Sequence, residues 1–375
     1  MINIRIPLAK PSFDDQEIEA VRRVLTSAWV VQGPEVEAFE KALARLHQTK
    51  HCIAVSSGTA ALHICYLSLG IGLGDAVFIP SFAWPSAANM AMAVNARPVF
   101  VDVLADTYNI DPDDLRMRIK ECLDQKWGKP KAIVPVHEFG LAADMDAIIK
   151  VSDEFNLMII EDAACALGTT YKGHPVGSFG ALSILSFHPR KSITTGEGGA
   201  ILTNDDELAD KCQMWRNHGQ VFHVESRDFP VAGFNYRMTE IQAAIGQVQL
   251  KKFPEILKKR KQLASQYLSE LVGCPWMRLP ADNPEHTWQT LMVVLDSQID
   301  LSKMLNTLCQ SGIGAGKGSV AAHCMQVYKE NFGYKDGDLP QSSRLDHKGL
   351  ALPLYPDMRT EEVSHCLKEI RAASC

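Results

Sequence analysis

Short apolar runs alternate with helix-like segments between about residue 50 and residue 205. Runs of this length that are rich in β-branched residues are typical of buried strands. Because strands that alternate with helices pair mostly in parallel, the pattern predicts a mostly parallel sheet covered by helices. The predicted strands are 51–55, 76–80, 98–103, 131–136, 157–162, 181–187 and 199–203. The predicted crossover helices are 58–70, which ends at Gly70, and 85–96, with Pro85 in its first turn.

The pattern changes after Gly233, where helical periodicity dominates. Residues 239–252 and 254–273 are predicted as consecutive helices, and the second is amphipathic and highly charged. We expect that second helix to lead into another domain. Beyond it come a strand (290–296), a helix (300–312), a glycine-rich stretch and a last helix from about 360 to 373. We therefore predict an α/β protein with a large domain, 1–250, and a smaller C-terminal α/β domain, 251–375.

Composition and charge narrow the class of protein. Hydrophobic residues make up 46% of the 375 residues, and the net charge of -6 argues against nucleic acid or an anionic membrane as a partner. The 10 cysteines form no CxxC pair, so we interpret them as reduced thiols. We find no apolar run long enough to span a membrane and no secretory signal at residues 1–12. These features predict a cytoplasmic protein.

A strand, a hydroxyl-rich turn and a helix follow one another directly at residues 51–70. Ser57, Gly58 and Thr59 stand at the predicted start of the helix, where backbone N–H groups have no partner within the helix. Such a turn can bind a phosphate, because glycine allows close approach and hydroxyls add hydrogen bonds. The simpler alternative is a well-capped helix without a ligand.

Three further side chains are predicted at the same edge of the sheet. Asp162 ends a strand where open α/β folds bind ligands, and it could keep the nitrogen of a pyridine ring protonated. Lys191 follows the next strand and could attack an aldehyde if burial lowers its pKa. Trp84 could stack on a flat ring. The alternatives are a capping or ion-paired aspartate, a solvated lysine beside Arg190, and a tryptophan packed under a helix.

Four motifs are each weak signals alone, but together and in this order they are specific for one protein family. They are SSGTAALH, PSFAW, EDAACALG and SFHPRKSITTGEGGA. In this order and spacing they resemble the sugar-nucleotide aminotransferases of the DegT/DnrJ/StrS family, which have the type I (aspartate aminotransferase) fold. The resemblance extends through ADMDAI, RNHGQ, GFNYRMTEIQAAIGQVQL and SAWVVQGPEVEAFE, and it weakens after residue 270. It therefore covers nearly the whole chain.

The resemblance implies pyridoxal 5′-phosphate (PLP) as cofactor and assigns residues to it. Lys191 matches the lysine that forms the internal aldimine and then moves protons during the reaction. Asp162 matches the partner of the pyridinium nitrogen, and Trp84 matches the stacking residue. The phosphate would be held at Ser57, Gly58, Thr59 and Ser186, and by Asn235 of the neighbouring subunit. The resemblance thus implies a homodimer with shared active sites.

Some positions depart from the family pattern. Cys165 stands where a glutamine usually contacts the phenolic oxygen of the cofactor, and a thiol is a weak hydrogen-bonding group. Leu167 and Leu141 replace residues that are commonly histidine and glutamine. A branch of the fold family that removes a sugar hydroxyl carries histidine in place of the lysine, so Lys191 argues against that chemistry.

We therefore expect transfer of an amino group, most readily from glutamate, to a keto group on a nucleotide-linked sugar of the 4-keto-6-deoxy type. The alternatives are another PLP chemistry, such as sugar dehydration or an aldol-type cleavage, and a non-catalytic protein that kept the fold. For the substrate we consider His323, Lys317 and His188, and a diphosphate contact at 314–319, with packing roles as the alternative. We predict no metal site.

Overall fold

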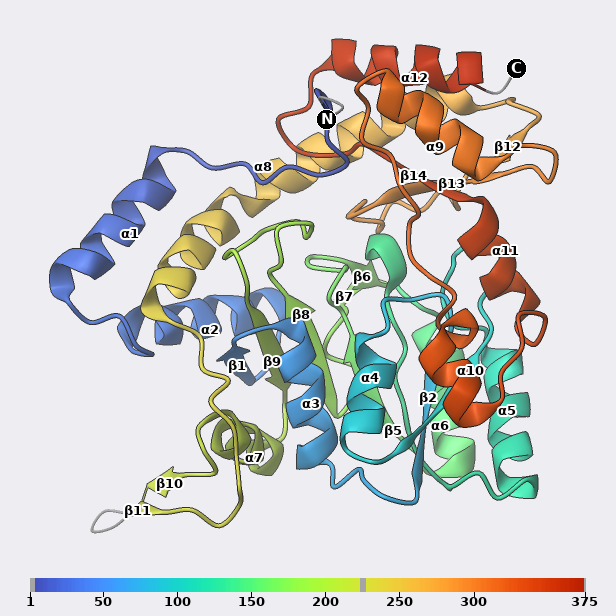
Figure 1. Cartoon of the computed structure of the whole chain (residues 1–375). Helices are drawn as coiled ribbons and strands as arrows, with labels where there is room; N and C mark the ends of the chain where they lie inside the picture. The colour runs from blue at the N-terminus through green and yellow to red at the C-terminus, as the bar shows by residue number, and fades with distance from the viewer. Residues whose placement is uncertain (1–3, 223–226, 374–375) are drawn as a thin grey trace.

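The computed structural model describes residues 4–222 and 227–373, and a seven-stranded sheet forms its centre (Figure 1). The strands are β1 (His51–Val55), β2 (Asp75–Pro80), β3 (Arg97–Val101), β4 (Lys129–Ile133), β5 (Met158–Asp162), β8 (Leu182–Ser186) and β9 (Gly199–Thr203). Their order in the sheet is β1-β9-β8-β5-β4-β2-β3. Neighbours from β3 to β8 run parallel, whereas β9 is antiparallel to β8 and β1. The mostly parallel mixed sheet and all seven predicted strands are confirmed.

Helices cover both faces of this sheet, because successive side chains of a strand point to opposite faces. In β2, Val77 and Ile79 pack with one group of helices, and Ala76 and Phe78 pack with another. The first group is α3 (Gly58–Ser68), α4 (Ser86–Ala93) and α7 (Asp206–Arg216). The other face carries α5 (Pro112–Asp124) and α6 (Met145–Phe155), with α2 (Pro34–His47) farther along. Both predicted crossover helices are confirmed, although Pro85 is the N-cap of α4 rather than part of its first turn.

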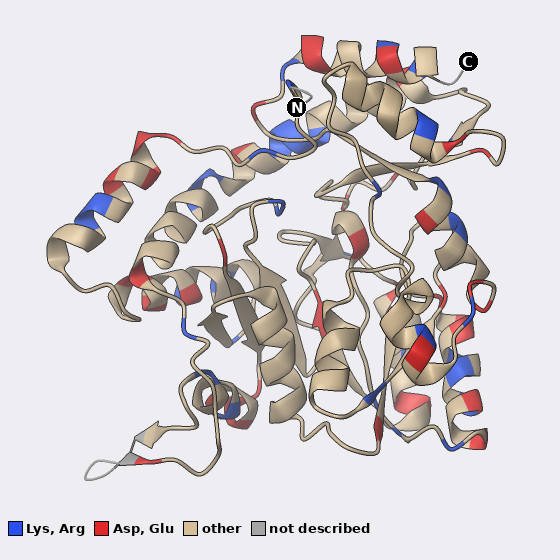
Figure 2. Cartoon of the chain, viewed as in Figure 1, with Lys and Arg blue, Asp and Glu red and all other residues tan. Residues whose placement is uncertain are grey.

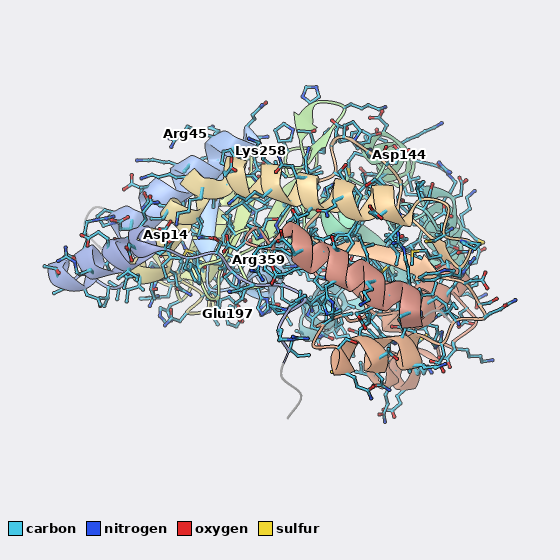
Figure 3. All side chains as sticks on the ribbon, turned by 90° about the horizontal axis from the view of Figure 1, so that it is seen from above. Asp14, Arg45, Asp144, Glu197, Lys258 and Arg359 are labelled. Carbon is cyan, nitrogen blue, oxygen red and sulfur yellow. The ribbon has the colours of Figure 1, made fainter. Side chains whose placement is uncertain are left out.

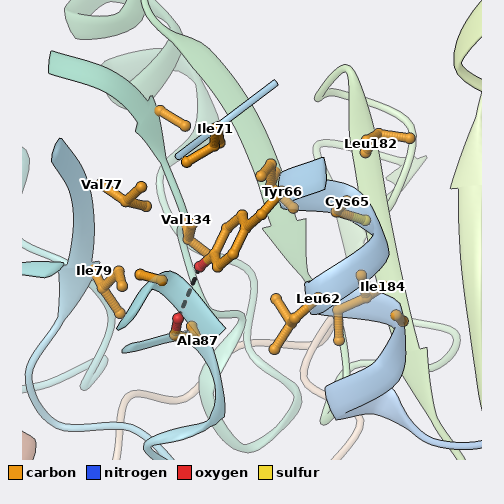
Figure 4. Close-up of a cluster of buried hydrophobic side chains, with 14 of the residues drawn as sticks. Leu62, Cys65, Tyr66, Ile71, Val77, Ile79, Ala87, Val134, Leu182 and Ile184 are labelled. Carbon is orange, nitrogen blue, oxygen red and sulfur yellow. Dashed lines mark hydrogen bonds between the residues drawn. The ribbon is translucent and has the colours of Figure 1, made fainter. Parts of the chain in front are cut away.

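The core between α3, α4 and the sheet is apolar, and the phenol of Tyr66 is buried in it (Figure 4). Tyr66 of α3 is fully buried, and its hydroxyl donates a hydrogen bond to the Ala87 carbonyl of α4 at 3.0 Å. Leu62 and Ile184 pack in the same cluster. This core holds the start of α3 against the ends of the strands, where the predicted phosphate turn lies.

The prediction of two consecutive helices after Gly233 is wrong, because α8 (Glu240–Leu271) is one helix of 32 residues with Pro254 inside it. Proline removes one backbone N–H donor from a helix. Buried Phe253 and Ile256 anchor α8 to the core on both sides of that position. Figure 3 shows α8 crossing the molecule, with α1 (Asp15–Ser27) and α2 beside one part and α12 (Thr360–Ala373) beside the other.

A second, smaller core lies at the far end of α8. Its three-stranded antiparallel sheet consists of β12 (Met277–Arg278), β13 (Leu291–Leu295) and β14 (Gly349–Leu352), packed with α9 (Leu301–Gln310) and α12. The N-terminal segment joins this core, since Ile6 bridges to Ile313. The predicted boundary after residue 250 falls inside α8, and it stays a prediction.

The remaining elements are short. They are the hairpins β6 (Thr170–Tyr171) with β7 (His174–Pro175) and β10 (Val221–Phe222) with β11 (Arg227–Asp228), the 3-10 turns η1 (Glu138–Gly140) and η2 (Ala322–Cys324), and the helices α10 (Gln326–Phe332) and α11 (Pro340–Lys348).

The surface carries charges of both signs, and acidic and basic residues are mixed along α1 and α5 (Figure 2). No helix in the described ranges has the length and apolar character needed to cross a bilayer. The cysteines of these ranges are free thiols, and Cys375 lies outside them.

Candidate active site

A cavity of about 440 Å³ opens where the strands of the large sheet end and the smaller lobe begins. The large sheet contributes the residues after β1, β2, β4, β5 and β8, and the smaller lobe contributes Gln289, Thr290, Gly318 and Ser319. Most of the predicted site residues line this one cavity: Ser57, Gly58, Thr59, Trp84, Asp162, Cys165, Ser186, His188 and Lys191. Parallel strands that end at one edge therefore bring together residues that are far apart in the chain.

Lys191 lies in the connection from β8 to β9, which folds back tightly on itself. Its backbone N–H donates to the His188 carbonyl at 2.8 Å, and Phe187 pairs through its own N–H with the Gly198 carbonyl at 2.9 Å. These bonds aim the half-buried Lys191 into the cavity, where its Nζ lies 3.1 Å from the Cys165 Sγ. The solvated loop lysine considered above does not occur.

The electrostatics at Lys191 differ from the expectation of a lowered pKa. Burial does act to lower the pKa of Lys191, but the interaction with the Cys165 sulfur, which includes a hydrogen bond, and the acids Asp162 and Glu138 outweigh it. The pKa of the lysine consequently lies above its ordinary value. Burial also raises the pKa of Cys165 above its ordinary value, although Lys191 opposes this, so the sulfur stays a thiol at neutral pH.

Asp162 ends β5, and its side chain is only 8% exposed. One carboxylate oxygen accepts a hydrogen bond from the Ala164 N–H at 3.0 Å. Within the described ranges, the other oxygen accepts no hydrogen bond and is available to a ligand in the cavity. Burial raises the pKa of Asp162, and the Ala164 N–H and Lys191 partly oppose this shift. A cationic ring N–H bound beside Asp162 would favour the ionised form of this carboxylate, because an opposite charge offsets the effect of burial.

The neighbouring Glu161 points away from the cavity and holds the strand end in place. Its carboxylate is fully buried and accepts N–H groups from Gly177, Phe179 and Gly180 at 2.7–2.8 Å, and His137 Nε2 at 3.1 Å. Burial alone would raise the pKa of Glu161, but the bonds from His137 and the backbone lower it below its ordinary value. Glu161 is therefore a structural anion directly beside Asp162.

The turn before α3 combines a cap with close packing. The Ser57 hydroxyl accepts the Ala60 N–H at 3.1 Å, so it caps the helix, and the Thr59 hydroxyl lies 3.2 Å from that of Ser86. A Cβ at Gly58 would come within 3.0 Å of the Ser186 Cβ. Glycine therefore lets Ser186 approach the helix start, where unpaired N–H groups suit an anion.

Trp84 follows β2 and is 66% exposed at the cavity, so the packed tryptophan considered above does not occur. Three other predicted residues lie outside the cavity lining. His323 is fully buried and bonds the Ser81 hydroxyl at 2.6 Å, and Lys317 pairs with both oxygens of Asp346 at 3.0 Å. Asn235 forms a β-bridge with Asn217 and does not line the cavity.

Sequence reasoning missed Glu138, which lines the cavity and follows the end of β4. The same signal that found Asp162, an acid just after a buried strand, applies to Glu138 in the sequence KAIVPVHE. It also missed Gln289, whose amide donates to the Arg190 carbonyl at 2.7 Å and so ties the smaller lobe to the lysine loop. Arg190 itself lines the cavity and is exposed.

These residues fit PLP on their own chemistry. The cavity holds an amine that can bind an aldehyde, a buried carboxylate with a free oxygen for a ring nitrogen, and a helix start that glycine keeps open for a phosphate. The fold and the cavity together define a PLP-dependent transferase of type I fold.

Comparisons with known proteins give the family. The chain belongs to the DegT/DnrJ/EryC1/StrS aminotransferase family, whose profile matches residues 11–371. It is similar to the putative sugar aminotransferase Spr1654 from Streptococcus pneumoniae in its PMP form, with 27% identity, a TM-score of 0.91 and coverage of 99% of each chain. Helicobacter pylori PseC, an aminotransferase involved in pseudoaminic acid biosynthesis, is 26% identical with a TM-score of 0.91, and the match covers 98% of this chain and 99% of PseC. DesV of S. venezuelae, solved with a ketimine intermediate, is 31% identical with a TM-score of 0.88 and the same coverage.

The protein is therefore a sugar aminotransferase that depends on PLP. The resemblance found in the sequence, the fold class and the cofactor are confirmed.

Proposed function

We propose that this enzyme transfers the amino group of glutamate to a keto group on a nucleotide-linked sugar of the 4-keto-6-deoxy type. The observation that carries the proposal is the Lys191 amine, which lies in one cavity with Asp162 and the start of α3. When bound, PLP supplies an electron sink that stabilises negative charge on the carbon that loses its proton. The protein residues bind, orient and exchange protons with the reactants.

Lys191 is proposed to hold the cofactor covalently through Nζ and, once released, to carry the proton between the two reacting carbons. Asp162 keeps the ring nitrogen protonated through its free oxygen, and Trp84 covers one face of the ring. Ser57, Gly58, Thr59 and Ser186 hold the phosphate at the start of α3. Cys165 contacts the lysine before the cofactor binds.

His188 lines the cavity, and burial lowers its pKa, so it is a neutral hydrogen-bonding group for the sugar at neutral pH. Lys317 and His323 stay candidates for substrate contact. A diphosphate at Lys317 would share that side chain with Asp346. We also propose that the enzyme acts in the cytoplasm, since its free cysteines suit a reducing compartment.

We further propose a homodimer in which Asn235 reaches the phosphate of the partner subunit. Two observations support it: Asn235 lies outside the cavity of its own subunit, and the segment after α1 exposes Trp29, Val30 and Val31 together. Mixing Lys191→Ala with Asn235→Ala subunits tests the shared site. Exchange of subunits should restore activity, because one site of each mixed dimer has both residues intact. Two inactive variants that stay inactive after verified exchange would contradict the shared site.

The function is tested with glutamate and a panel of keto sugar nucleotides, with the product identified by mass. Transfer of nitrogen releases 2-oxoglutarate in equal amount to the amino sugar, whereas sugar dehydration or aldol-type cleavage does not. The wild-type enzyme should also show a visible cofactor band that borohydride bleaches. Lys191→Ala should lose both the bleaching and the turnover, and a variant that still bleaches would refute the lysine assignment.

A further inference from the structure

The loop that carries Glu138 is held from several sides. The Glu138 N–H donates to the Asn109 Oδ1 at 2.8 Å, and the same Asn109 side chain donates to the carbonyls of Leu141 at 3.1 Å and Ala142 at 3.0 Å. Asn109 is itself buried. One amide side chain thus fastens both ends of the loop, so the position of Glu138 is set before any ligand arrives.

The residue after Glu138 has a strained backbone. Phe139 has a φ of 56°, a left-handed conformation that is uncommon for a bulky residue. The Gln289 N–H, from the smaller lobe, donates to the Phe139 carbonyl at 2.9 Å and helps to hold it there. Strain of this kind persists where the surroundings enforce it, and it concentrates at functional sites. Glu138 and Phe139 both line the cavity, so this turn lies in its wall.

Glu138 as a whole residue is only 4% exposed, and no group in residues 4–222 and 227–373 makes a hydrogen bond to its carboxyl. The carboxyl lines the cavity, so a ligand bound there can supply the hydrogen-bond partner that these residues do not. The charged and titratable groups that act on it are Lys191, Asp162 and Cys165. The pKa of Glu138 is raised to about 8, chiefly by burial. The positive charge of Lys191 acts to lower this pKa, and the negative charge of Asp162 acts to raise it. At neutral pH the carboxyl is therefore mostly protonated and can donate a hydrogen bond.

Cys165 leaves a donor missing from the same cavity. By the resemblance described above, this position usually carries a glutamine amide that contacts the phenolic oxygen of the cofactor. A thiol is a weak donor, and here its sulfur already accepts the Lys191 Nζ at 3.1 Å. The phenolic oxygen lies next to the aldehyde that a lysine binds, so its donor has to come from the surroundings of Lys191.

We propose that Glu138 supplies this donor and hydrogen-bonds the phenolic oxygen of PLP, in place of the amide that Cys165 lacks. The inference rests on the proposed placement of the cofactor at Lys191. Glu138 would then help to position the cofactor. Its proton would also stabilise negative charge on the phenolic oxygen through the hydrogen bond. When Glu138 ionises, the donor is lost and a negative charge faces the oxygen.

The test compares three variants of the full-length protein. Glu138→Gln keeps a donor that cannot ionise, Glu138→Leu removes the donor, and Glu138→Leu with Cys165→Gln restores the family amide. Apoenzyme is titrated with PLP alone, and binding is read from the visible absorption band. We expect Glu138→Leu to weaken binding roughly 10- to 100-fold and to shift the band. Glu138→Gln should bind within about threefold of wild type, and the double variant should recover most of the loss.

The pH dependence gives an independent measurement. Wild-type affinity for PLP should fall as the pH rises above about 8, since the free carboxyl ionises there. The PLP affinity of Glu138→Gln should not show this decrease above about pH 8, because an amide does not ionise. The comparison of wild type with Glu138→Gln tests the proposal even if circular dichroism shows that Glu138→Leu does not fold. The proposal is overturned if Glu138→Leu binds as tightly as wild type with an unchanged band, if the double variant does not recover, or if Glu138→Gln keeps the full pH dependence.

The sugar reaction is not needed for any of these measurements, so the two proposals fail separately. An enzyme that binds PLP with a bleachable band but forms no 2-oxoglutarate from glutamate would defeat the proposed function alone. An active aminotransferase whose Glu138 variants bind PLP normally would defeat only the inference about Glu138.

Discussion

Glu161 offers a sharp test of how the strand end beside Asp162 is held. Its Oε1 accepts the N–H groups of Phe179 and Gly180, and its Oε2 accepts those of Gly177 and His137. The Ala143 N–H donates to His137 Nδ1 at 3.1 Å, so the proton of the neutral ring sits on Nε2 and points at Glu161. Both carboxylate oxygens consequently face only donors.

Glu161→Gln changes one oxygen into an NH2 group of nearly the same size. Whichever end the amide nitrogen takes, it faces two donors and leaves both without an acceptor. An unsatisfied buried donor costs about 1–3 kcal/mol, so we expect the free energy of unfolding to fall by about 2–6 kcal/mol. Glu285→Gln is the matched control. Glu285 also accepts hydrogen bonds from Thr170 and from backbone N–H groups, but water can reach it, so its variant should lose less than about 1 kcal/mol.

Urea denaturation of the apoenzymes, followed by circular dichroism, measures the difference. The pH dependence has a definite sign. Because the pKa of Glu161 is lowered in the folded protein, its contribution is present above the unfolded pKa of about 4.3 and is lost as the pH falls through the folded value. The difference in the free energy of unfolding between wild type and Glu161→Gln should therefore be constant from about pH 5 to 8 and decrease below about pH 4. Equal stability of the Glu161 and Glu285 variants at pH 7 would refute this reasoning.

Three further substitutions test other parts of the structure. Gly58→Ala places a Cβ 3.0 Å from that of Ser186, so PLP affinity, read from the visible band, should fall by about 1–3 kcal/mol, roughly 5- to 150-fold, with the fold intact. Arg216→Met leaves the mostly buried Glu40 without the guanidinium 2.7 Å away, and should cost about 3–5 kcal/mol in urea denaturation. Tyr66→Phe removes the bond to the Ala87 carbonyl, and should cost about 1 kcal/mol by the same measurement.

Hydrophobic patterning determined much of the architecture. Each predicted strand is a short, largely apolar run between polar turns, and runs of this kind become buried when they pair in a sheet covered by helices. The pattern failed at Pro254, because local sequence signals a helix break while buried Phe253 and Ile256 hold both halves in line. Helix continuity there depends on packing against elements far away in the chain, which local periodicity does not report.

The sequence by itself determined the chemistry available to the protein: a lysine, an aspartate and a glycine-hydroxyl turn at strand ends, in an order that identifies a cofactor and a family. Only the tertiary structure decided how these groups influence one another. It placed Cys165 and Glu138 beside Lys191, so that the lysine pKa rises where burial alone would lower it. It also separated His323 and Lys317 from the cavity by pairing them with Ser81 and Asp346. The reason is physical, since pKa values and hydrogen bonds depend on distance and burial, and both arise only when distant segments pack together.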